Sequence, residues 1–487
     1  MKPFVHIENL SIAYAGKSVL QDLSWTIFPG EQYLLGGASG SGKTTLAKAL
    51  AGLISNNALV NINYDNNIPL SAKTIYISNW YQFTNLEGDR NFYYQQRYNK
   101  HQGHDTLTVQ AELQHYAEKE NLQWESLLPK IHSFGFSELM SSQLIELSSG
   151  EHKKLQLLKG LWLKPQLLII DEPYTGLDKA SRHVLNSWLD ELVDEGVQLI
   201  LISNDSQYPD SINRFAHLVD GKLEIVSTFD ELTQDSPRER KELPSFLKTA
   251  PNSSFEYVAR LKDIIIHYDE KQVLKQVSWD IKVGERWLLQ GPNGSGKSTL
   301  LSILNGDHPQ SYGLDIELFG NKRGSGESIW DIKEKIGMIS PEMHWYFDQN
   351  ATVWHTIASG FYDSIGWFID VKFQEKKQIE ELLEFFELTP FKNQLLHTLP
   401  LGKQRLAMLA RCIIKNPVLL VLDEPCQGLD NQQAQYFNDV LDELSQFGKT
   451  LIYVGHYESQ LPSNLTHRIR LERGEVVAQE NIVENVL

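Results

Sequence analysis

The sequence has 487 residues, of which 41% are hydrophobic and 22% are charged, and its formal net charge is −17. This length predicts at least two domains, and the composition is that of a globular protein rather than a disordered chain. The acidic balance argues against wholesale binding of a nucleic-acid backbone, which needs a basic footprint, but it leaves room for a local basic patch.

The sequence also lacks several other features. No hydrophobic stretch approaches the roughly 18 residues of a membrane-spanning helix, and the start, MKPFVHIENLSIAY, lacks the apolar core of a signal peptide. Cys412 and Cys426 make no disulfide framework, and no Cys/His cluster suggests zinc. We therefore expect a cytoplasmic protein that is able to dock peripherally at the inner face of the cell membrane.

Much of the chain is an internal repeat. DLSWTIFPGEQYLLGGASGSGKTTL (22–46) matches QVSWDIKVGERWLLQGPNGSGKSTL (276–300) at an offset of 254 positions. LLIIDEPYTGLD (167–178) matches LLVLDEPCQGLD (419–430) at an offset of 252. Shared polar residues at fixed spacing predict two homologous domains in tandem, because coincidental apolar strands would not keep them.

The repeat defines the predicted domain organisation. We expect one domain at 1–235 and a second at 256–487, with a linker at 236–255 where charge, proline and serine cluster without periodicity. Within each half, short apolar strands alternate with helical segments, and the continuous runs LLII and LLVL are typical of buried parallel strands. Each domain is therefore predicted to be α/β, with a mostly parallel sheet covered by helices.

The first candidate site residue of each half is a tyrosine. Tyr14 and Tyr268 each stand 29 positions before the lysine of a glycine-rich loop, Lys43 and Lys297. An aromatic ring at this place is able to stack on adenine. The alternative is an ordinary strand tyrosine in a hydrophobic core, and we favour stacking.

Next in each half comes a phosphate-binding loop of the pattern G-x-x-x-x-G-K-[ST]. Its glycines let backbone N–H groups surround phosphate oxygens, the lysine reaches the β- and γ-phosphates, and Thr44 and Ser298 are placed to hold Mg²⁺. Two such loops, each between a strand and a helix, disfavour a glycine turn with an incidental lysine. The predicted ATP-binding residues here are Gly37, Ser39, Gly40, Ser41, Gly42, Lys43, Thr44 and Thr45, and Gly291, Asn293, Gly294, Ser295, Gly296, Lys297, Ser298 and Thr299.

Later in each half an apolar strand ends in two carboxylates. Asp171 and Asp423 are predicted to bind Mg²⁺ through water, and Glu172 and Glu424 to polarise the attacking water. A lone Asp-Glu pair after a strand is usually a solvated strand end. Its repetition beside a phosphate-binding loop predicts the second part of an ATPase site, with ATP and Mg²⁺ as cofactors.

Taken together, these motifs resemble the ATP-binding-cassette (ABC) ATPases over nearly the whole chain. The family signature LSGGQ corresponds here to LSSGE (147–151) and to LPLGK (399–403). The resemblance implies two tandem P-loop NTPase domains, each with a mainly parallel sheet core, an antiparallel β part and a helical subdomain.

The resemblance also implies intramolecular head-to-tail pairing of the two domains. Each ATP would lie between one half's phosphate-binding loop and the other half's signature, so that Ser148, Ser149, Gly150 and Gly402 contact ATP. Site one combines the N-terminal loop with LPLGK, and site two combines the C-terminal loop with LSSGE. Pro400 offers neither a hydroxyl nor a backbone N–H, so site one loses donors for the γ-phosphate.

A second departure is predicted to affect the same site. The family's switch histidine corresponds to His456 in YVGHYE, but to Asn204 in LISNDS, and asparagine carries no proton at neutral pH. We therefore predict that site two hydrolyses ATP with Glu424 and His456, whereas site one, with Glu172, binds ATP and turns over slowly. The alternative is that both changes are neutral in two competent sites.

The family's coupling glutamine has no clear counterpart. Pro341 and Glu342 follow the relevant strand in the second half, whereas Asn79 follows it in the first, with Gln82 the nearest glutamine. The sequence then turns aromatic in both halves, at 79–99 and 344–368. These aromatic residues are expected in the helical subdomain, where they meet a partner, stack on bases or pack internally.

A narrower resemblance lies at 306–337, where GDHPQ-x-Y and RGSGE-x-IWDIK resemble the second half of ModF-type tandem ATPases, which are associated with molybdate transport and called photorepair-like. It favours the energising subunit of a transporter, partnered by a membrane-embedded subunit and importing a molybdate-like oxyanion or a metal. The alternative is a soluble ATPase acting on ribosomes, nucleic acid or a repair complex. The short linker and acidic balance count against this, although Arg90–Arg97 is a candidate basic patch.

Overall fold

The structure is a computed structural model, and it falls into two compact units. Apart from the stretch 91–103, the division lies between Ser236 and Pro237, and we call the N-terminal part unit 1 and the C-terminal part unit 2. Each unit is described by itself. The structure describes residues 2–14, 17–54, 62–64, 74–79, 106–233, 241–250, 254–268, 271–341, 343, 347–364, 371–455 and 461–482, without the side chains of 14, 17, 149 and 271.

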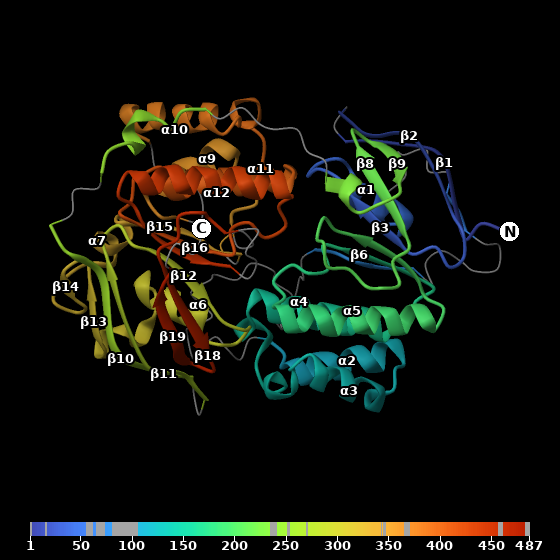
Figure 1. Ribbon diagram of the computed structural model, residues 1–487, viewed down its shortest axis with the longest axis horizontal. Coiled ribbons are helices and arrows are strands. Elements are labelled where there is room, and N and C mark those ends of the chain that lie inside the picture. The colour runs from blue at the N-terminus through green and yellow to red at the C-terminus, as the bar shows by residue number, and fades with distance from the viewer. Residues whose placement is uncertain are drawn as a thin grey trace. The chain divides into compact units, whose positions relative to one another are not determined.

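Unit 1 contains two sheets (Figure 1). The smaller is antiparallel, with the order β2-β1-β4. The larger has the order β5-β6-β7-β3-β8-β9 and is parallel except for the last pair. The strands are β1 (Val5–Tyr14), β2 (Lys17–Ile27), β3 (Tyr33–Gly36), β4 (Ile62–Tyr64), β5 (Thr74–Ile77), β6 (Leu167–Asp171), β7 (Gln198–Ile202), β8 (Arg214–Val219) and β9 (Lys222–Val226).

Local signals in the sequence set the ends of the unit 1 helices. Ser148 and Asp178 accept hydrogen bonds from backbone N–H groups in the first turns of α4 and α5, which is the preferred N-cap chemistry. The helices are α1 (Lys43–Leu50), α2 (Val109–Glu120), α3 (Trp124–Ser133), α4 (Ser149–Trp162) and α5 (Lys179–Asp194).

Unit 2 repeats this plan. Its antiparallel sheet has the order β11-β10-β13-β14, and its larger sheet has the order β15-β16-β17-β12-β18-β19, again parallel except for the last pair. The strands are β10 (Tyr257–Tyr268), β11 (Lys271–Lys282), β12 (Arg286–Gln290), β13 (Asp315–Leu318), β14 (Asn321–Lys322), β15 (Ile336–Ile339), β16 (Leu419–Asp423), β17 (Thr450–Val454), β18 (His467–Glu472) and β19 (Glu475–Asn481).

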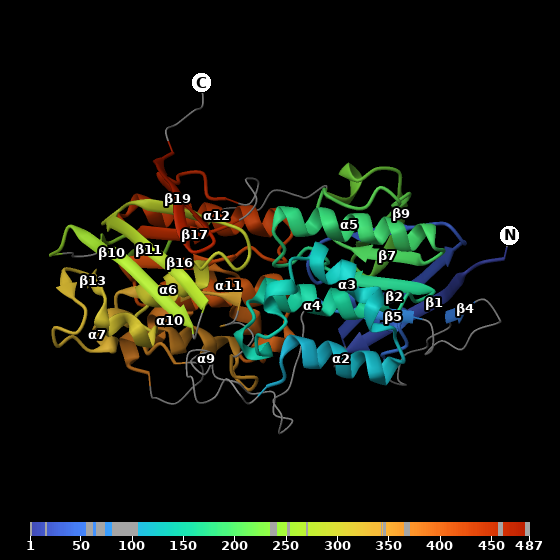
Figure 2. The ribbon, with the colours of Figure 1, turned by 90° about the horizontal axis from the view of Figure 1, so that it is seen from below.

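The helices of unit 2 lie on the side of its larger sheet away from the antiparallel strands, except for α6 and α7 (Figures 1 and 2). They are α6 (Lys297–Leu304), α7 (Ile329–Lys333), α9 (Val353–Ala358), α10 (Phe373–Phe385), α11 (Leu401–Ile413) and α12 (Asn431–Gln446). The identical strand order of the two larger sheets confirms the predicted fold class, a repeated α/β domain with a mainly parallel core and an antiparallel part. Within the described residues, the structure contains no helix that is both long and apolar enough to cross a membrane.

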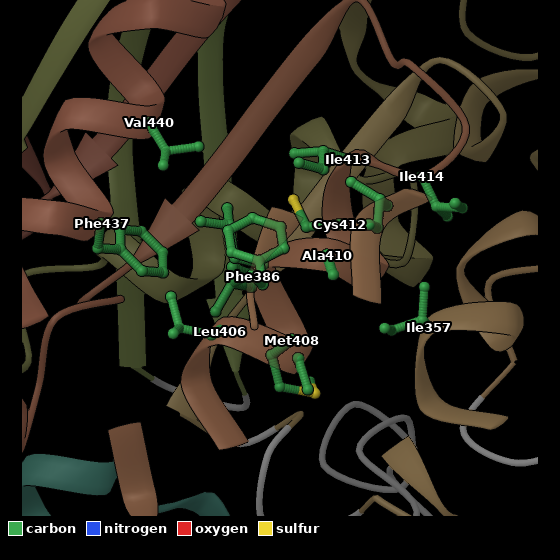
Figure 3. Close-up of a cluster of buried hydrophobic side chains, with 14 of the residues drawn as sticks. Ile357, Phe386, Leu406, Met408, Ala410, Cys412, Ile413, Ile414, Phe437 and Val440 are labelled. Carbon is green, nitrogen blue, oxygen red and sulfur yellow. The ribbon is translucent and has the colours of Figure 1, made fainter. Parts of the chain in front are cut away.

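Alternation along the strands creates a separate core on each face of the larger sheet of unit 2. Leu288 and Leu420 pack into the helical core, whereas Leu289 and Val421 pack into the core beneath the antiparallel strands. Figure 3 shows the helical core, where side chains of α11 such as Leu406 meet residues from α9, α12 and the end of α10. These two cores hold the strand ends that carry the site.

Part of the predicted linker belongs to unit 2. Leu243 and Leu247 are 3% and 0% exposed and join its helical core. Their apolar side chains, four positions apart, are buried although the surrounding sequence is polar. The exact domain boundaries stay a prediction.

Candidate nucleotide sites

The two phosphate-binding loops need glycine for a steric reason. A Cβ on Gly37 would lie 2.4 Å from the Leu218 carbonyl oxygen, and one on Gly291 would lie 2.2 Å from that of Leu471. Both loops end in a glycine with φ above +100°, which caps α1 or α6 in a left-handed conformation. The loop backbone is therefore open toward the helix N-terminus, as an anion cradle requires.

The lysine of each loop folds back across it. Lys43 Nζ donates to the carbonyl oxygens of Gly37 and Ala38 at 2.6 and 2.9 Å, and Lys297 Nζ donates to those of Gly291 and Pro292 at 2.8 and 2.9 Å. Each ammonium group is thereby held at the centre of its loop. Phosphate oxygens entering the loop would meet this charge together with the N–H groups of the loop.

Sheet topology brings the predicted magnesium residues of unit 1 together. β3 and β6 both pair with β7, where Leu35 and Asp171 both lie opposite Ile202. The Thr44 hydroxyl donates to Asp171 Oδ2 at 2.7 Å. A hydroxyl and a carboxylate in contact at the carboxyl end of a parallel sheet fit a Mg²⁺ ion that binds both oxygens, directly or through water.

Tyr76 is a residue of this site that sequence analysis missed. Its hydroxyl donates to Asp171 Oδ2 at 3.1 Å, and burial followed by the charge of Asp171 raises the pKa of Tyr76. The tyrosine therefore stays a proton donor that fixes the carboxylate. Unit 2 has Met338 at the equivalent strand position, where no such donor is available. Asp423 is 8% exposed at the end of β16, as predicted.

The two glutamates predicted to be catalytic share an unusual backbone conformation. Glu172 and Glu424 have φ values of +48° and +43°, and their N–H groups donate to the last carbonyl of the neighbouring strand at 2.9 and 3.1 Å. Non-glycine residues rarely adopt this conformation, and such strain concentrates at functional sites. Its presence in both units shows that the backbone turns in the same way at each glutamate.

The two glutamates differ in their surroundings. Burial first, and then the charge of Asp171, raises the pKa of Glu172 to about 8, although Lys43 and Lys153 oppose the shift. Burial and Asp171 therefore favour the protonated form of Glu172, although part of its surface is open to solvent. In unit 2, the Gln427 side-chain amide donates to Glu424 Oε2 at 2.9 Å.

Lys153 is a second residue missed by sequence analysis. This α4 side chain is 3% exposed and donates to the carbonyl oxygens of Ser78, Asn79 and Asp171 at 3.0, 3.2 and 3.4 Å. Burial lowers the pKa of Lys153 to about 7. It ties the end of β5 to the end of β6. The repeat carried a signal for it, because Arg405, 1% exposed, stands 252 positions later.

The two signature loops begin their helices differently. Ser148 caps α4 in a reciprocal box with Glu151, whose carboxylate accepts from the Ser148 N–H and hydroxyl at 2.7 and 2.8 Å. Pro400 is the N-cap residue of α11 and makes no side-chain cap hydrogen bond. Gly402 lies in the first turn of α11, where a Cβ would come within 2.2 Å of Gln433 Oε1. Gly150 lies in the first turn of α4.

Asn204 clamps the first glycine of its own phosphate-binding loop. Its Oδ1 accepts from Gly37 N, and its Nδ2 donates to Gly37 O, both at 3.0 Å. A side-chain amide can make this pair because it carries both a donor and an acceptor. Asn204 therefore supports the loop rather than acting as a proton carrier.

Several predicted residues lie outside the described part of the chain. Tyr268 is described, and its hydroxyl lies 2.8 Å from His308 Nε2. The residues or side chains outside the description are Tyr14, Gln82, Arg90–Arg97, Ser149, Glu342 and His456. The pairing of each loop with the other half's signature stays a prediction.

Both halves of the chain resemble known proteins. The ABC transporter family model matches residues 20–175 and 274–427. The ABC transporter ATP-binding protein ModF of Escherichia coli is 33% identical over 473 residues, covering 91% of this chain and 92% of that protein. An uncharacterised ABC transporter ATP-binding protein of Schizosaccharomyces pombe is 30% identical over 488 residues, covering 98% of this chain and 99% of that protein.

A solved nucleotide-free ATP-binding cassette from an ABC transporter is 22% identical, with a TM-score of 0.40, and covers 46% of this chain and 91% of that chain. The family model matches each half of the chain once, and the ModF relative spans both halves. The chain therefore belongs to the ABC transporter ATP-binding family, as a tandem ABC protein of the ModF type.

Proposed function

We propose that each half binds ATP with Mg²⁺ and that the chain is an ATPase. One repeated arrangement supports this proposal: the strand before the glycine loop and the strand with the acidic end lie on either side of one shared strand, β7 in unit 1. In unit 1 this arrangement puts the Thr44 hydroxyl 2.7 Å from Asp171. Lys43 and Lys297 supply positive charge for the phosphates. Bound Mg²⁺ supplies further charge for the β- and γ-phosphate oxygens.

The proposed mechanism is asymmetric. Site two uses Lys297, Asp423 and Glu424, with His456 and the Ser148 signature, and Glu424 orients the attacking water. Site one pairs the N-terminal loop with Pro400, which offers no hydroxyl or N–H to developing charge. The clamp of Asn204 on Gly37 supports a binding role for site one, because the amide stabilises the loop and carries no proton. This arrangement requires the two halves to pair head to tail.

The lysines provide the test. In the Lys297→Ala chain, turnover should fall about 100-fold or more, as for a lost transition-state donor, while one nucleotide stays bound. In the Lys43→Ala chain, part of the turnover should remain and the retained nucleotide should be lost. The double variant is the control for residual binding. Equal losses in the two single variants would overturn the asymmetry, and unchanged ATP binding in the double variant would overturn the ATP sites themselves.

We further propose that ATP turnover energises a transport system at the inner face of the membrane, importing a molybdate-like oxyanion or a metal. Membership of an ABC transporter family and likeness to ModF-type proteins support this. The tagged chain should co-purify with an integral membrane protein that stimulates its ATPase activity. Salt-dependent binding to ribosomes or nucleic acid, with no such membrane protein, would instead favour the non-transport ATPase.

A further inference from the structure

The sequence strings GDHPQ-x-Y and RGSGE-x-IWDIK meet in unit 2, and one residue of the first touches the proposed adenine-binding tyrosine. Tyr268 ends β10, and its hydroxyl lies 2.8 Å from Nε2 of His308, with the two ring centroids 5.8 Å apart. His308 is 0% exposed. His308 is therefore buried against the tyrosine, although it is not part of the phosphate-binding loop.

The direction of this hydrogen bond follows from the rest of the imidazole ring. The Gln310 N–H donates to Nδ1 at 3.3 Å, so Nδ1 carries no proton. Burial lowers the pKa of His308 to about 4, so the ring is neutral near pH 7 and its single proton lies on Nε2. His308 therefore donates to the Tyr268 oxygen, which fixes the tyrosine and leaves its own proton for another acceptor.

His308 is itself anchored to the helix that starts at the phosphate-binding loop. Its N–H and that of Asp307 donate to the carbonyl oxygen of Ser302 in α6 at 3.2 and 3.0 Å. The Ser311 hydroxyl donates to the His308 carbonyl oxygen at 2.7 Å. The imidazole is thus held in a fixed relation to the end of α6, the helix whose first residue is the phosphate-binding lysine.

Residues of the second string, RGSGE-x-IWDIK, contact the turn that contains His308. Lys333 pairs with Asp307 at 2.7 Å, and the fully buried Arg323 donates to the Gly306 carbonyl oxygen at 3.3 Å. Arg323 also pairs with Glu327 at 3.0 Å and lies 4.5 Å from the ring centre of Tyr312. The two strings therefore form one cluster, which holds His308 in place.

We propose that His308 is a positioning residue that holds the Tyr268 ring as the stacking platform for the adenine base at the C-terminal phosphate loop. The Tyr268 ring stacks on the adenine base, and the hydrogen bond from His308 fixes the position of that ring relative to the phosphate-binding loop. The N-terminal half has Ile54 at the equivalent position, a partly buried side chain packed against the core. The isoleucine side chain has no hydrogen-bond donor, so it is unable to play this part in the N-terminal half. The inference rests on the proposed ATP site.

The test compares a ligand that has the adenine base with one that has only phosphates. In a chain carrying Lys43→Ala, which leaves the C-terminal loop as the binding site, the affinities for ATP and for inorganic tripolyphosphate are measured by calorimetry. His308→Leu should weaken ATP binding about twofold to tenfold, the range expected for one lost hydrogen bond, and leave tripolyphosphate binding unchanged. Tyr268→Phe should do the same, and His308→Gln, which keeps an N–H donor, should restore most of the loss.

His267→Gln is the matched control, because His267 is an exposed neighbour of Tyr268 and should change neither affinity. Equal weakening of both ligands by His308→Leu would mean that His308 only supports the loop, and unchanged ATP binding would mean that the ring needs no positioning. Either result overturns the inference. If His308→Leu fails to fold, Tyr268→Phe tests the same bond. Undiminished ATP binding after adding Lys297→Ala would instead overturn the proposed function.

Discussion

Glu172 and Glu424 have the same backbone conformation, but the side chains around them differ. Both glutamates sit in the same strained turn, with φ near +45° and an N–H bonded to the neighbouring strand. In unit 1, Asp171 accepts hydrogen bonds from Thr44 and Tyr76, whereas Met338 replaces the tyrosine in unit 2. The repeat has kept the geometry that presents the carboxylate while the groups around it have diverged.

A second difference lies next to the glutamates themselves. Thr175 stands in unit 1 where Gln427 donates to Glu424 in unit 2, and Lys153 stands where unit 2 has Arg405. An arginine keeps its charge under all ordinary conditions, whereas burial lowers the pKa of Lys153 to about 7. Around the two glutamates, the halves therefore differ in their charged and polar side chains and not in the backbone turn, and variants of these residues measure how much this difference matters.

The largest expected effect is on turnover, from the glutamates. Glu424→Gln should lower kcat by about 100-fold or more, as for loss of a general base, and Glu172→Gln by only a few-fold. Steady-state ATPase assays with analysis of bound nucleotide measure both, and Glu195→Gln, a half-exposed carboxylate on the surface of unit 1, is the control. Loss of turnover in Glu172→Gln alone would reverse the assignment, and equal losses would show two equivalent sites.

Replacing the buried lysine should have the next largest effect. Lys153→Met leaves the carbonyl oxygens of Ser78, Asn79 and Asp171 without this donor. We expect the free energy needed to separate β5 from β6 by local unfolding to fall by about 2 kcal/mol. Hydrogen exchange of peptides covering β6 should become roughly 30-fold faster. Peptides covering β16 in unit 2 are the internal control, and equal acceleration there would refute a local role for Lys153.

The sequence predicted the parts of the fold that depend on short-range patterns. Glycine spacing located both phosphate-binding loops, and apolar runs ending in Asp-Glu located β6 and β16. The shared strand order of the two units confirms that the repeat predicted one architecture twice. These features were predictable because a phosphate cradle or a buried parallel strand restricts the residues at its own positions.

The supporting contacts were not predictable, because they join residues distant in sequence. Tyr76 meets Asp171 through the pairing of β5 with β6, and Asn204 meets Gly37 across 167 positions. Asn204 was predicted as a lost histidine, but its role as a bidentate clamp depends on the loop geometry. Lys153 carried a weak signal, a basic residue at the same helical position in both halves, which only burial makes meaningful.

The clamp gives a smaller expected effect, on nucleotide affinity. Asn204→Leu removes both hydrogen bonds to Gly37, and ATP binding at the N-terminal loop should weaken about tenfold. Calorimetry in a Lys297→Ala chain isolates this loop. Asn204→Gln is the comparison, because it keeps the amide on a longer stem. Undiminished affinity in Asn204→Leu would show that Lys43 and the glycines hold the loop unaided.

The last expected effect, similar in size, is a pH dependence of stability that belongs to unit 1. The pKa of Glu172 is raised from 4.5 to about 8, so between these values the folded state holds a proton that the unfolded chain has lost. Because the folded state binds more protons there, this group makes stability fall as pH rises. Glu172→Gln removes the titration, while Asp171, Lys43, Lys153 and Asp205 remain.

The variant should therefore gain stability relative to the wild-type chain between about pH 5 and about pH 8. We expect a gain of about 1–2 kcal/mol, well below the full linkage value because part of Glu172 is open to solvent. Urea unfolding across this range measures the difference, and Glu195→Gln should show none. A constant difference between about pH 5 and about pH 8 would mean that burial does not raise the pKa of Glu172 in the folded chain. If the variant also lost stability relative to the wild-type chain as the pH rose toward 4.5, Lys43 and Lys153 would outweigh burial, and both glutamates would be charged and prepared to act as bases.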